Sequence, residues 1–224
     1  IPALNEERYI KNIISQVLNG FNTEAIVVDG GSSDHTRNIA LDAGGKVITS
    51  QPGRALQMNL GAKLATGDIL LFLHADSALP DLWDYHIRKI MKQPNISLGF
   101  FKFGINVHFP AKKLIEWGTN FRSYFLNRPY GDQGLFMKKN DFNELKGFPD
   151  VPILEDLLML KKAKEIGKIS TTGKVLLTSG RRWIKYGVLK TTLINQYILI
   201  AAWMGTDLAN LSHTYYRNNS NRRS

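Results

Sequence analysis

Two acidic residues stand just past apolar segments that are expected to be buried strands. Asp29 ends the β-branched run 25–29, and Asp76 follows the apolar run 68–73. Ligands of open α/β sheets bind outside the carboxyl ends of the strands, so we expect both acids on one rim. A carboxylate there can hold Mg²⁺ or Mn²⁺, which prefer oxygen ligands and phosphates and would neutralise a diphosphate leaving group. A turn-capping role is the alternative for Asp76.

The turn after Asp29 reads Gly-Gly-Ser-Ser-Asp at 30–34. Glycines let the main chain approach a ligand closely, and the N-terminus of the helix expected next favours anions. Phosphates are therefore expected near this turn. The alternative is an ordinary strand-to-helix turn in which Ser33 or Asp34 caps the helix.

The adjacent acids Glu155 and Asp156 open an apolar helix that is expected over 155–166. The helix dipole accounts for one acid at that place. A desolvated acid there can also serve as the general base that deprotonates an acceptor hydroxyl. The sequence leaves open whether the pair is structural or catalytic.

Cationic and aromatic residues supply candidate ligand contacts. Arg54 precedes a helix, where it suits a phosphate or a partner acid, or is a plain surface arginine. Arg181, Arg182 and Trp183 either clamp phosphates and stack on an acceptor or form a basic edge with the indole in the core. His74 is a further metal ligand or, as we favour, a partly buried imidazole that donates to a carbonyl.

A glycine-bracketed loop at 130–134 carries two polar side chains. Such loops often hold binding residues on a rigid scaffold. We therefore expect Gly131, Asp132 and Gln133 to form part of the wall of an acceptor site.

The apolar periodicity supplies a scaffold for these residues. Helical and strand patterns alternate in the first half with short connections, which predicts a parallel sheet with right-handed crossovers. Expected there are helices over 7–18, 34–43 and 55–65 and strands over 25–29, 46–49 and 68–73. Expected in the less regular second half are strands within 98–107 and 134–138, helices over 112–126 and 155–166, a turn or short helix at 141–145, and an extended segment over 169–178.

The overall composition narrows the class of protein. The chain has no cysteine, which excludes disulfides and thiolate metal sites. The net charge of +10 favours anionic surfaces or substrates, but no nucleic-acid-binding motif accompanies it. No run of about 18 apolar residues is present that would span a membrane by itself. The sequence opens at Ile1 in what resembles the end of a strand, and we expect further strand residues before it.

The tail contains an apolar segment, 193–204, that is expected to be a helix. One face of this helix would carry Leu193, Tyr197, Ile200, Ala201 and Met204. We favour packing of that face on the domain. The alternative is contact with a bilayer or a partner, helped by Lys185 and Lys190.

In combination, these segments resemble family 2 of the inverting glycosyltransferases, which have the GT-A fold. The matching motifs are Ile-Pro-Ala-Leu-Asn-Glu-Glu at 1–7, Val-Val-Asp-Gly-Gly-Ser-Ser-Asp-His-Thr at 27–36, His-Ala-Asp at 74–76, Gly-Asp-Gln-Gly at 131–134 and Leu-Glu-Asp at 154–156. They run in the family's order as far as Trp183. Phe-Leu-His-Ala-Asp-Ser at 72–77, with Arg-Arg-Trp and the tail helix, is further similar to a subgroup of small bacterial members.

The resemblance implies an α/β fold with a mixed, mainly parallel sheet flanked by helices. A single domain over 1–224 would comprise a nucleotide-binding half (1–100), an acceptor half (101–183) and a C-terminal helical tail (184–224).

The resemblance also implies roles for matching residues. Asp29 would bind the base of the nucleotide, and Asp76 would be the metal-linked acid of an Asp-x-Asp motif whose first acid is here His74. Asp156 would be the general base, with Glu155 as the less favoured alternative. The nucleotide-binding set would be completed by Pro2, Ala3, Glu6, Gly30, Arg54, Asn59 and Ala75. The acceptor and phosphate contacts would come from Gly131, Asp132, Gln133, Arg181, Arg182 and Trp183.

The implied function is transfer of a sugar, with inversion, from a UDP- or GDP-linked donor to an unidentified acceptor hydroxyl, with Mg²⁺ or Mn²⁺. Ser179 stands where the family's Gln-x-x-Arg-Trp motif has Gln, which argues against a processive synthase. A non-catalytic nucleotide-sugar binding protein stays open. So does a sugar nucleotidyltransferase, although that would need a basic Gly-rich loop that residues 1–8 lack.

The expected location is the cytoplasm, at the inner face of the membrane. The expected partners besides the donor are a lipid-linked acceptor, a membrane surface as a peripheral contact, and a second copy in a homodimer. Nucleic acid is not expected.

Overall fold

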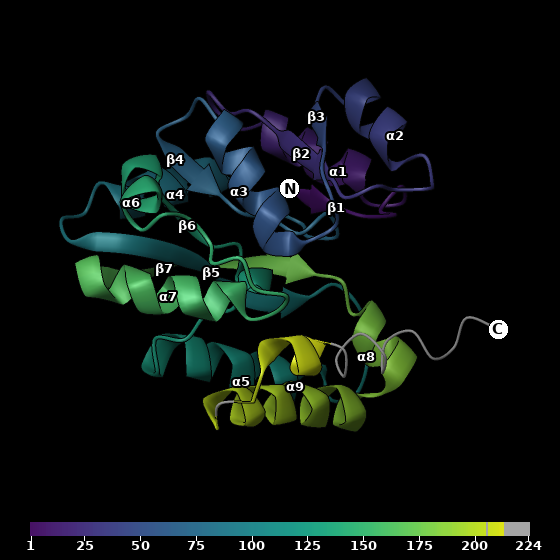
Figure 1. Ribbon diagram of the computed structural model, residues 1–224, viewed down its shortest axis with the longest axis vertical. Helices are drawn as coiled ribbons and strands as arrows, with labels where there is room; N and C mark the ends of the chain where they lie inside the picture. The colour runs from purple at the N-terminus through teal and green to yellow at the C-terminus, as the bar shows by residue number, and fades with distance from the viewer. Residues whose placement is uncertain (205, 213–224) are drawn as a thin grey trace.

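The computed structural model describes residues 1–204 and 206–212 as an α/β arrangement of helices around two sheets (Figure 1). The first half contains β1 (Pro2–Ala3), α1 (Ile10–Leu18), β2 (Ile26–Asp29), α2 (Thr36–Asp42), β3 (Lys46–Thr49), α3 (Arg54–Leu64), β4 (Ile69–Leu71) and α4 (Trp83–Met91). The second half contains β5 (Ile96–Ile105), α5 (Lys112–Phe125), the 3₁₀ helix η1 (Gly131–Gln133), β6 (Phe136–Lys138), α6 (Lys139–Glu144), α7 (Glu155–Ile166), β7 (Lys168–Thr178), α8 (Arg181–Tyr186) and α9 (Val188–Trp203).

The described strands fall into two sheets. One has the order β1-β2-β3 and is parallel throughout; the other has the order β4-β6-β5-β7, in which β6 runs antiparallel and β5 pairs with β7 in parallel. The mixed, mainly parallel α/β fold is thus confirmed. In the described residues β1 is two residues long and pairs with β2. Between β2 and β4 lies a cavity of about 430 Å³, which Ile1, α3 and α4 also line.

Two of the three hydrophobic clusters among the described residues meet at β5. Successive side chains of a strand point to opposite faces, so Phe101 packs with α1 and α4 while Phe100 packs with α3 and α7. Phe72 joins the second cluster, where its ring lies 4.8 Å from the ring of Phe148. The core therefore fixes the ends of β4 and the start of α7, the two places where the candidate acids lie.

Polar side chains close the edge of β5 that β6 leaves free. The amide of Asn120 accepts from the Phe103 N–H at 2.8 Å and donates to its carbonyl at 3.0 Å. Glu116 accepts from the Ile105 N–H at 2.7 Å. Because an unpaired backbone group in the interior is costly, these contacts replace the missing strand neighbour. α5 thus turns polar residues toward the sheet.

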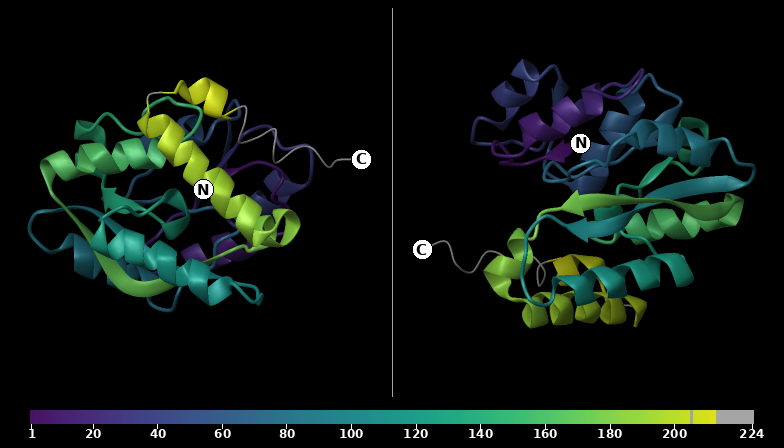
Figure 2. Two further views of the ribbon diagram at one scale, coloured as in Figure 1. Left: turned by 90° about the horizontal axis from the view of Figure 1, so that it is seen from below. Right: turned by 180° about the vertical axis from the view of Figure 1, so that it is seen from behind.

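Most expected elements are confirmed within a few residues, and two helices are additional. No element was expected around α4 or directly after β7, where the basic residues begin the short helix α8. In Figures 1 and 2, α5, α8 and α9 lie beyond β5 and β7, on the side away from β1–β3.

The favoured orientation of the tail helix was wrong. Four of the five residues on the face expected to pack on the domain are exposed, namely Leu193, Tyr197, Ile200 and Met204. The buried side of α9 instead carries Ile198 and Ala201, which pack with Ile153 and Leu211. The helix is apolar around much of its circumference, so its sequence alone does not indicate which side is inside.

Glu24 ties the start of the first sheet to the loop after α3. One carboxylate oxygen accepts from the Thr66 N–H at 2.6 Å and from its hydroxyl at 2.8 Å, and the other accepts from Lys46 at 2.7 Å. Burial by itself would raise the pKa of Glu24, but these hydrogen bonds hold it at about 2. The carboxylate therefore stabilises the fold in its charged form.

Glu24→Gln is expected to lower the free energy of unfolding by about 1–2 kcal/mol at pH 7, a value reduced because the group is partly exposed. A carboxyl group with a depressed pKa stabilises the fold above its unfolded pKa and loses that effect as pH falls. The difference from the wild type should therefore shrink from pH 4.5 toward pH 2. Urea titrations across this range check it, with the exposed Glu144→Gln as control; a constant difference at all pH values would refute the charged role.

Candidate functional site

The turn after β2 is built around a fully buried carboxylate. Asp29 accepts hydrogen bonds from the backbone N–H groups of Gly31 and Ser32, each at 3.0 Å, and from the Ser32 hydroxyl. Gly31 has φ +94°, a left-handed conformation that glycine adopts readily. The guanidinium of Arg37 lies 4.0 Å away. Asp29 thus lies at the carboxyl end of β2 and also holds the conformation of the turn that follows.

Asp29→Asn is expected to lower the free energy of unfolding by about 1–3 kcal/mol, because an amide cannot accept from all three donors. Chemical denaturation measures this directly. A variant as stable as the wild type would show that the buried contacts are dispensable. The result matters for function, because weakened nucleotide binding in an Asp29 variant would otherwise be assigned wholly to lost ligand contacts.

An arginine joins two carboxylates at the carboxyl ends of the strands. Arg181, the first residue of α8, lies 2.6 and 3.0 Å from the two oxygens of Glu6 and 3.1 Å from Oδ2 of Asp76. Its guanidinium also lies over the ring of Tyr9, 5.3 Å from the centroid. Burial raises the pKa values of Glu6 and Asp76, and the charge of Arg181 opposes that rise. Two acids distant in sequence therefore converge on one cation.

A second arginine connects His74 to the start of α7. Arg54 donates to Nε2 of His74 at 2.6 Å, and its Nε lies 3.3 Å from Glu155 Oε1. Burial, with the charges of Arg54 and Arg181, lowers the pKa of His74 well below its usual value. Burial, reinforced by the neighbouring Asp156, raises the pKa of Glu155. His74 is thus a neutral acceptor rather than the donor to a carbonyl that the sequence favoured.

Asp156, the second residue of α7, lies beside these groups. Its Oδ2 accepts from the Gly131 N–H at 2.6 Å, and it lines a small cavity with Arg54, His74 and Gly131. A Cβ on Gly131 would come within 3.0 Å of the Arg54 guanidinium, so the glycine lets the loop approach. Leu154 has φ +65°, an uncommon conformation for a bulky residue, and it sets the direction in which α7 begins.

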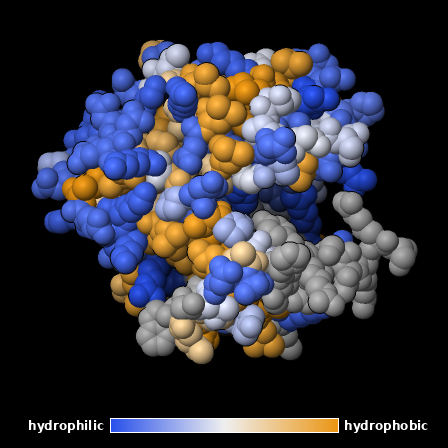
Figure 3. All heavy atoms as spheres, viewed as in Figure 1, coloured by the Kyte–Doolittle hydropathy of each residue, from blue (hydrophilic) through white to orange (hydrophobic). Residues whose placement is uncertain are grey.

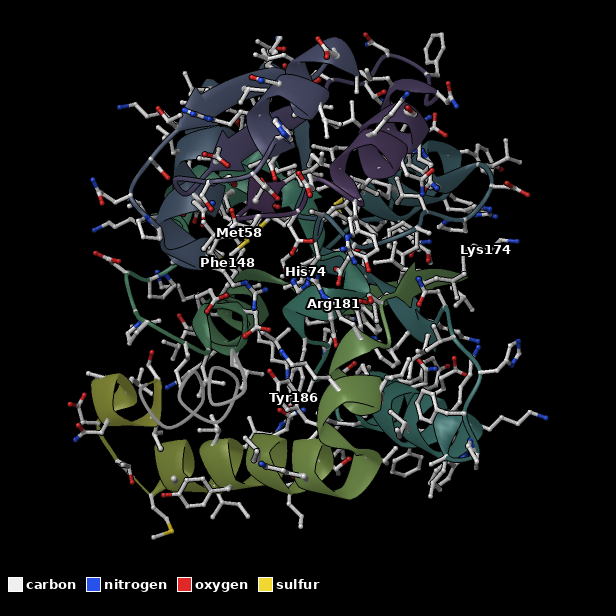
Figure 4. All side chains as sticks on the ribbon, turned by 90° about the vertical axis from the view of Figure 1, so that its right-hand side faces the viewer. Met58, His74, Phe148, Lys174, Arg181 and Tyr186 are labelled. Atoms are coloured by element: carbon white, nitrogen blue, oxygen red, sulfur yellow. The ribbon has the colours of Figure 1, made fainter. Side chains whose placement is uncertain are left out.

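Figure 4 shows His74 and Arg181 close together in the middle of the molecule, with Met58 and Phe148 beside His74. Arg54 binds His74 and Arg181 binds Asp76, two residues further along the chain, so the two arginine clusters adjoin and form one site. The motifs around Glu6, Asp76, Arg54, Asp156 and Arg181 are therefore brought together from five separate stretches of sequence.

Several candidate residues have structural contacts instead. The amide of Asn59 binds the backbone of Phe148 at 2.8 and 2.9 Å. Gln133 is buried and binds Ser123, Tyr130 and the Phe101 carbonyl. Ala75 packs in the core. These side chains are engaged in the scaffold.

The remaining candidates lie at the margins of the site. Pro2 and Ala3 form β1, and the Ala3 carbonyl accepts from the Gly30 N–H at 2.9 Å. Asp132 is half-buried in η1, next to Gly131. The half-buried ring of Trp183 packs edge-on to Phe103 at 5.9 Å, so it lies at the edge of the core rather than inside it. The side chain of Arg182 lies outside the described part of the structure.

Sequence reasoning missed two contributors. Ser32 donates hydrogen bonds to Asp29 from its N–H and its hydroxyl. A serine three residues after an aspartate in a turn is a recognisable sequence signal for such contacts. Gln57 is buried in α3 and donates to the carbonyls of Ala3 at 3.0 Å and Val28 at 2.7 Å. No sequence signal marks Gln57, because its partners are backbone atoms of distant strands.

The donor set suits a divalent cation that completes its coordination with substrate oxygens. Among residues 1–204 and 206–212, no three His, Asp or Glu side chains form a ready-made metal cage. Glu6 and Asp76 nevertheless share one cation, the guanidinium of Arg181. Mg²⁺ and similar ions are often held by one or two carboxylates plus substrate phosphates, so the residues present fit such an ion.

The sequence pattern described as glycosyl transferase family 2 matches residues 1–144, well over half of the chain. The chain belongs to glycosyl transferase family 2. The resemblance read from its motifs is thereby confirmed.

Among curated relatives in the family, glucosyl-3-phosphoglycerate synthase of Mycolicibacterium smegmatis is 34% identical over 93 residues, which cover 36% of this chain and 31% of the relative. The 4,4'-diaponeurosporenoate glycosyltransferase of Staphylococcus haemolyticus is 33% identical over 88 residues, covering 35% of this chain and 24% of the relative. The chain thus spans about a third of the length of the relatives it matches, or less.

Solved structures show the same fold. Glucosyl-3-phosphoglycerate synthase of Mycobacterium tuberculosis in complex with Mn²⁺, UDP and glucosyl-3-phosphoglycerate superposes with a TM-score of 0.63 at 18% identity, covering 92% of this chain and 77% of that one. Its complex with Mn²⁺ and UDP-glucose superposes with a TM-score of 0.55 at 18% identity, covering 77% and 67%. The GT-A fold is confirmed; at this identity the likeness concerns the fold alone.

Proposed function

We propose that this family 2 chain transfers a sugar, with inversion, from UDP-glucose or a related UDP-sugar to an acceptor hydroxyl with the help of Mg²⁺ or Mn²⁺. The observation that carries the proposal is the convergence of two kinds of acid in one site. The carboxylates of Glu6 and Asp76 both contact the guanidinium of Arg181. Asp156 lies half-buried beside His74 and Arg54. A transferase needs both a cationic place for the diphosphate and a base for the acceptor.

The residues divide the reaction between them. A divalent cation bound with Asp76 would neutralise the developing charge on the leaving diphosphate. Arg54 and Arg181 are positioned to add positive charge there. Asp156 accepts the proton of the acceptor hydroxyl as its oxygen bonds to the anomeric carbon. The bond from that carbon to the diphosphate oxygen breaks, its electron pair leaves with the nucleoside diphosphate, and the configuration inverts.

The choice of base between Glu155 and Asp156 favours Asp156. Glu155 is 3% exposed and pairs with Arg54, whereas Asp156 is half-buried at the edge of the small cavity. A general base must come within hydrogen-bond distance of the acceptor hydroxyl, which a buried, paired carboxylate does not allow. Glu155 is therefore proposed to hold Arg54 in place.

The proposed donor and the proposed acceptor rest on different observations. UDP is preferred over GDP because the superposed synthase is described in complex with UDP-glucose. The acceptor is proposed to be lipid-linked and presented at the inner face of a membrane, since the chain is strongly basic and exposes apolar helix faces. No helix in the described ranges, 1–204 and 206–212, is long and apolar enough to cross a bilayer.

The proposal is tested by incubating the protein with UDP-glucose and Mn²⁺ without an acceptor and measuring UDP and free glucose. A transferase releases both slowly, because water can replace the acceptor. Absence of release under all conditions, with tight binding of the nucleotide sugar, would favour the binding-protein alternative. Formation of UTP and glucose 1-phosphate on addition of pyrophosphate would favour a nucleotidyltransferase instead.

A further inference from the structure

The helix α5 has its polar and apolar sides reversed relative to a helix on a water-facing surface. Its polar residues Glu116 and Asn120 point to β5 and bond its backbone, and Ser123 is its buried residue. Surface helices of globular proteins normally turn their apolar stripe inward and their charges outward. The polar residues of α5 face the sheet, so the side of the helix that faces away from the sheet carries its apolar residues.

An aromatic stripe covers that outward side. Trp117, Phe121 and Phe125 follow one another at intervals of four residues, with ring centroids 5.5 and 4.8 Å apart. They are 66%, 45% and 66% exposed. Leu114 and Tyr124 extend the same side and are also exposed. We call these five residues the aromatic face. Contiguous exposed apolar side chains of this size mark a contact surface.

The helix α9 adds a second apolar strip on the same side of the molecule. Its exposed residues Leu193, Tyr197 and Ile200, with Met204 directly after its end, recur at helical spacing. Figures 1 and 2 place α5 and α9 together beyond β5 and β7, and Figure 3 shows a few hydrophobic residues at the surface near the lower edge of that view, among hydrophilic ones.

The exposed charges beside these helices are mainly basic. Lys185 in α8 and Lys190 in α9 are exposed, and the acidic Asp207 follows the end of α9. Around the aromatic face, Lys113 and Arg128 are exposed, and the acidic residue of α5, Glu116, is turned to β5. Basic residues beside an apolar helix face complement anionic lipid headgroups, whereas two copies of this surface would repel each other.

We propose that the aromatic face of α5, together with the exposed strip of α9, seats the protein on an anionic lipid bilayer. The aromatic rings insert at the boundary between headgroups and acyl chains, while the lysines and arginines bind the headgroups. This seating gives the proposed transferase access to a membrane-embedded acceptor, but it is independent of catalysis and is tested by binding alone.

The test is co-flotation of the whole chain with vesicles of phosphatidylcholine or of a mixture with about one third phosphatidylglycerol, an anionic lipid. The wild type is expected to float with the anionic vesicles and to be released by about 0.5 M salt, which screens surface charge. The triple variant Trp117→Gln, Phe121→Gln, Phe125→Gln should bind at least about tenfold more weakly, because its inserted apolar area is lost. Its fold is checked by circular dichroism.

A matched triple variant separates this surface from general hydrophobicity. Phe21, Leu41 and Leu64 are 81%, 56% and 46% exposed on the other side of the molecule, and Gln at all three should leave flotation unchanged. Brominated lipids should quench the tryptophan fluorescence of the wild type. The variant Trp117→Phe should bind the vesicles normally, but its remaining tryptophan fluorescence should be quenched less. Equal flotation of both triple variants and the wild type would overturn the proposal. Absence of flotation, with a dimer that only the α5 variant dissociates, would assign the face to a second copy and also overturn it.

Discussion

Asp76→Asn should abolish metal-dependent turnover, with a fall in kcat/KM of about 10²–10³. The Asp76 carboxylate lies in the loop after β4, and its Oδ2 is 3.1 Å from the guanidinium of Arg181, which also contacts Glu6. An amide keeps the shape but lacks the charge that holds Mg²⁺ or Mn²⁺ beside the diphosphate. Turnover of UDP-glucose at increasing Mn²⁺ is the measurement.

The control is Asp81→Asn, which removes a charge from an exposed loop residue a few positions further along the chain. It should leave turnover unchanged. The unfolding free energy of Asp76→Asn should stay within about 1 kcal/mol of the wild type, because Arg181 keeps Glu6 as its partner. Undiminished, Mn²⁺-dependent turnover in Asp76→Asn would remove this residue from the mechanism.

Asp156→Asn should lower kcat by about 10²–10⁴ and leave the affinity for UDP-glucose nearly unchanged. The amide oxygen can still accept from the Gly131 N–H, so the loop should keep its position. What is lost is the ability to take a proton from the acceptor hydroxyl. Transfer kinetics and calorimetry of the same variant separate the two effects.

Two further variants sharpen this comparison. Glu165→Gln removes an exposed carboxylate from the same helix and should behave like the wild type. Glu155→Gln should disturb the contact with Arg54 and weaken binding of the donor. If Glu155 were the general base, the same variant would lower kcat alone. If Glu155→Gln shows the catalytic loss and Asp156→Asn does not, the assignments of the two acids must be exchanged.

The sequence located the strands that precede Asp29 and Asp76, although β4 ends at Leu71, two residues earlier than expected. The apolar runs before Asp29 and Asp76 are short and bounded by turn residues, so both strands are recognisable. α7 was predicted to the residue, since its apolar periodicity begins at Glu155 and ends before Gly167. The motif order indicated the family, and the GT-A fold followed from it.

What could not be predicted depends on contacts between distant segments. The pairing of Arg181 with Glu6 spans 175 residues, and a basic tripeptide gives no hint of its partner. Asn59 and Gln133 were assigned to the site from their motifs, yet their amides bind backbone atoms. The outward apolar face of α5 also escaped notice, because its sequence shows periodicity but not direction.

The most direct test of the proposed site is calorimetric titration of the protein with UDP, in Mn²⁺ and in EDTA, beside the same titrations with GDP. UDP is expected to bind in Mn²⁺, with binding that is lost in EDTA and strongly weakened in Asp76→Asn, and GDP is expected to bind more weakly. UDP binding of equal strength in EDTA, or binding that Asp76→Asn leaves intact, would contradict a site in which Asp76 and a divalent cation hold the diphosphate.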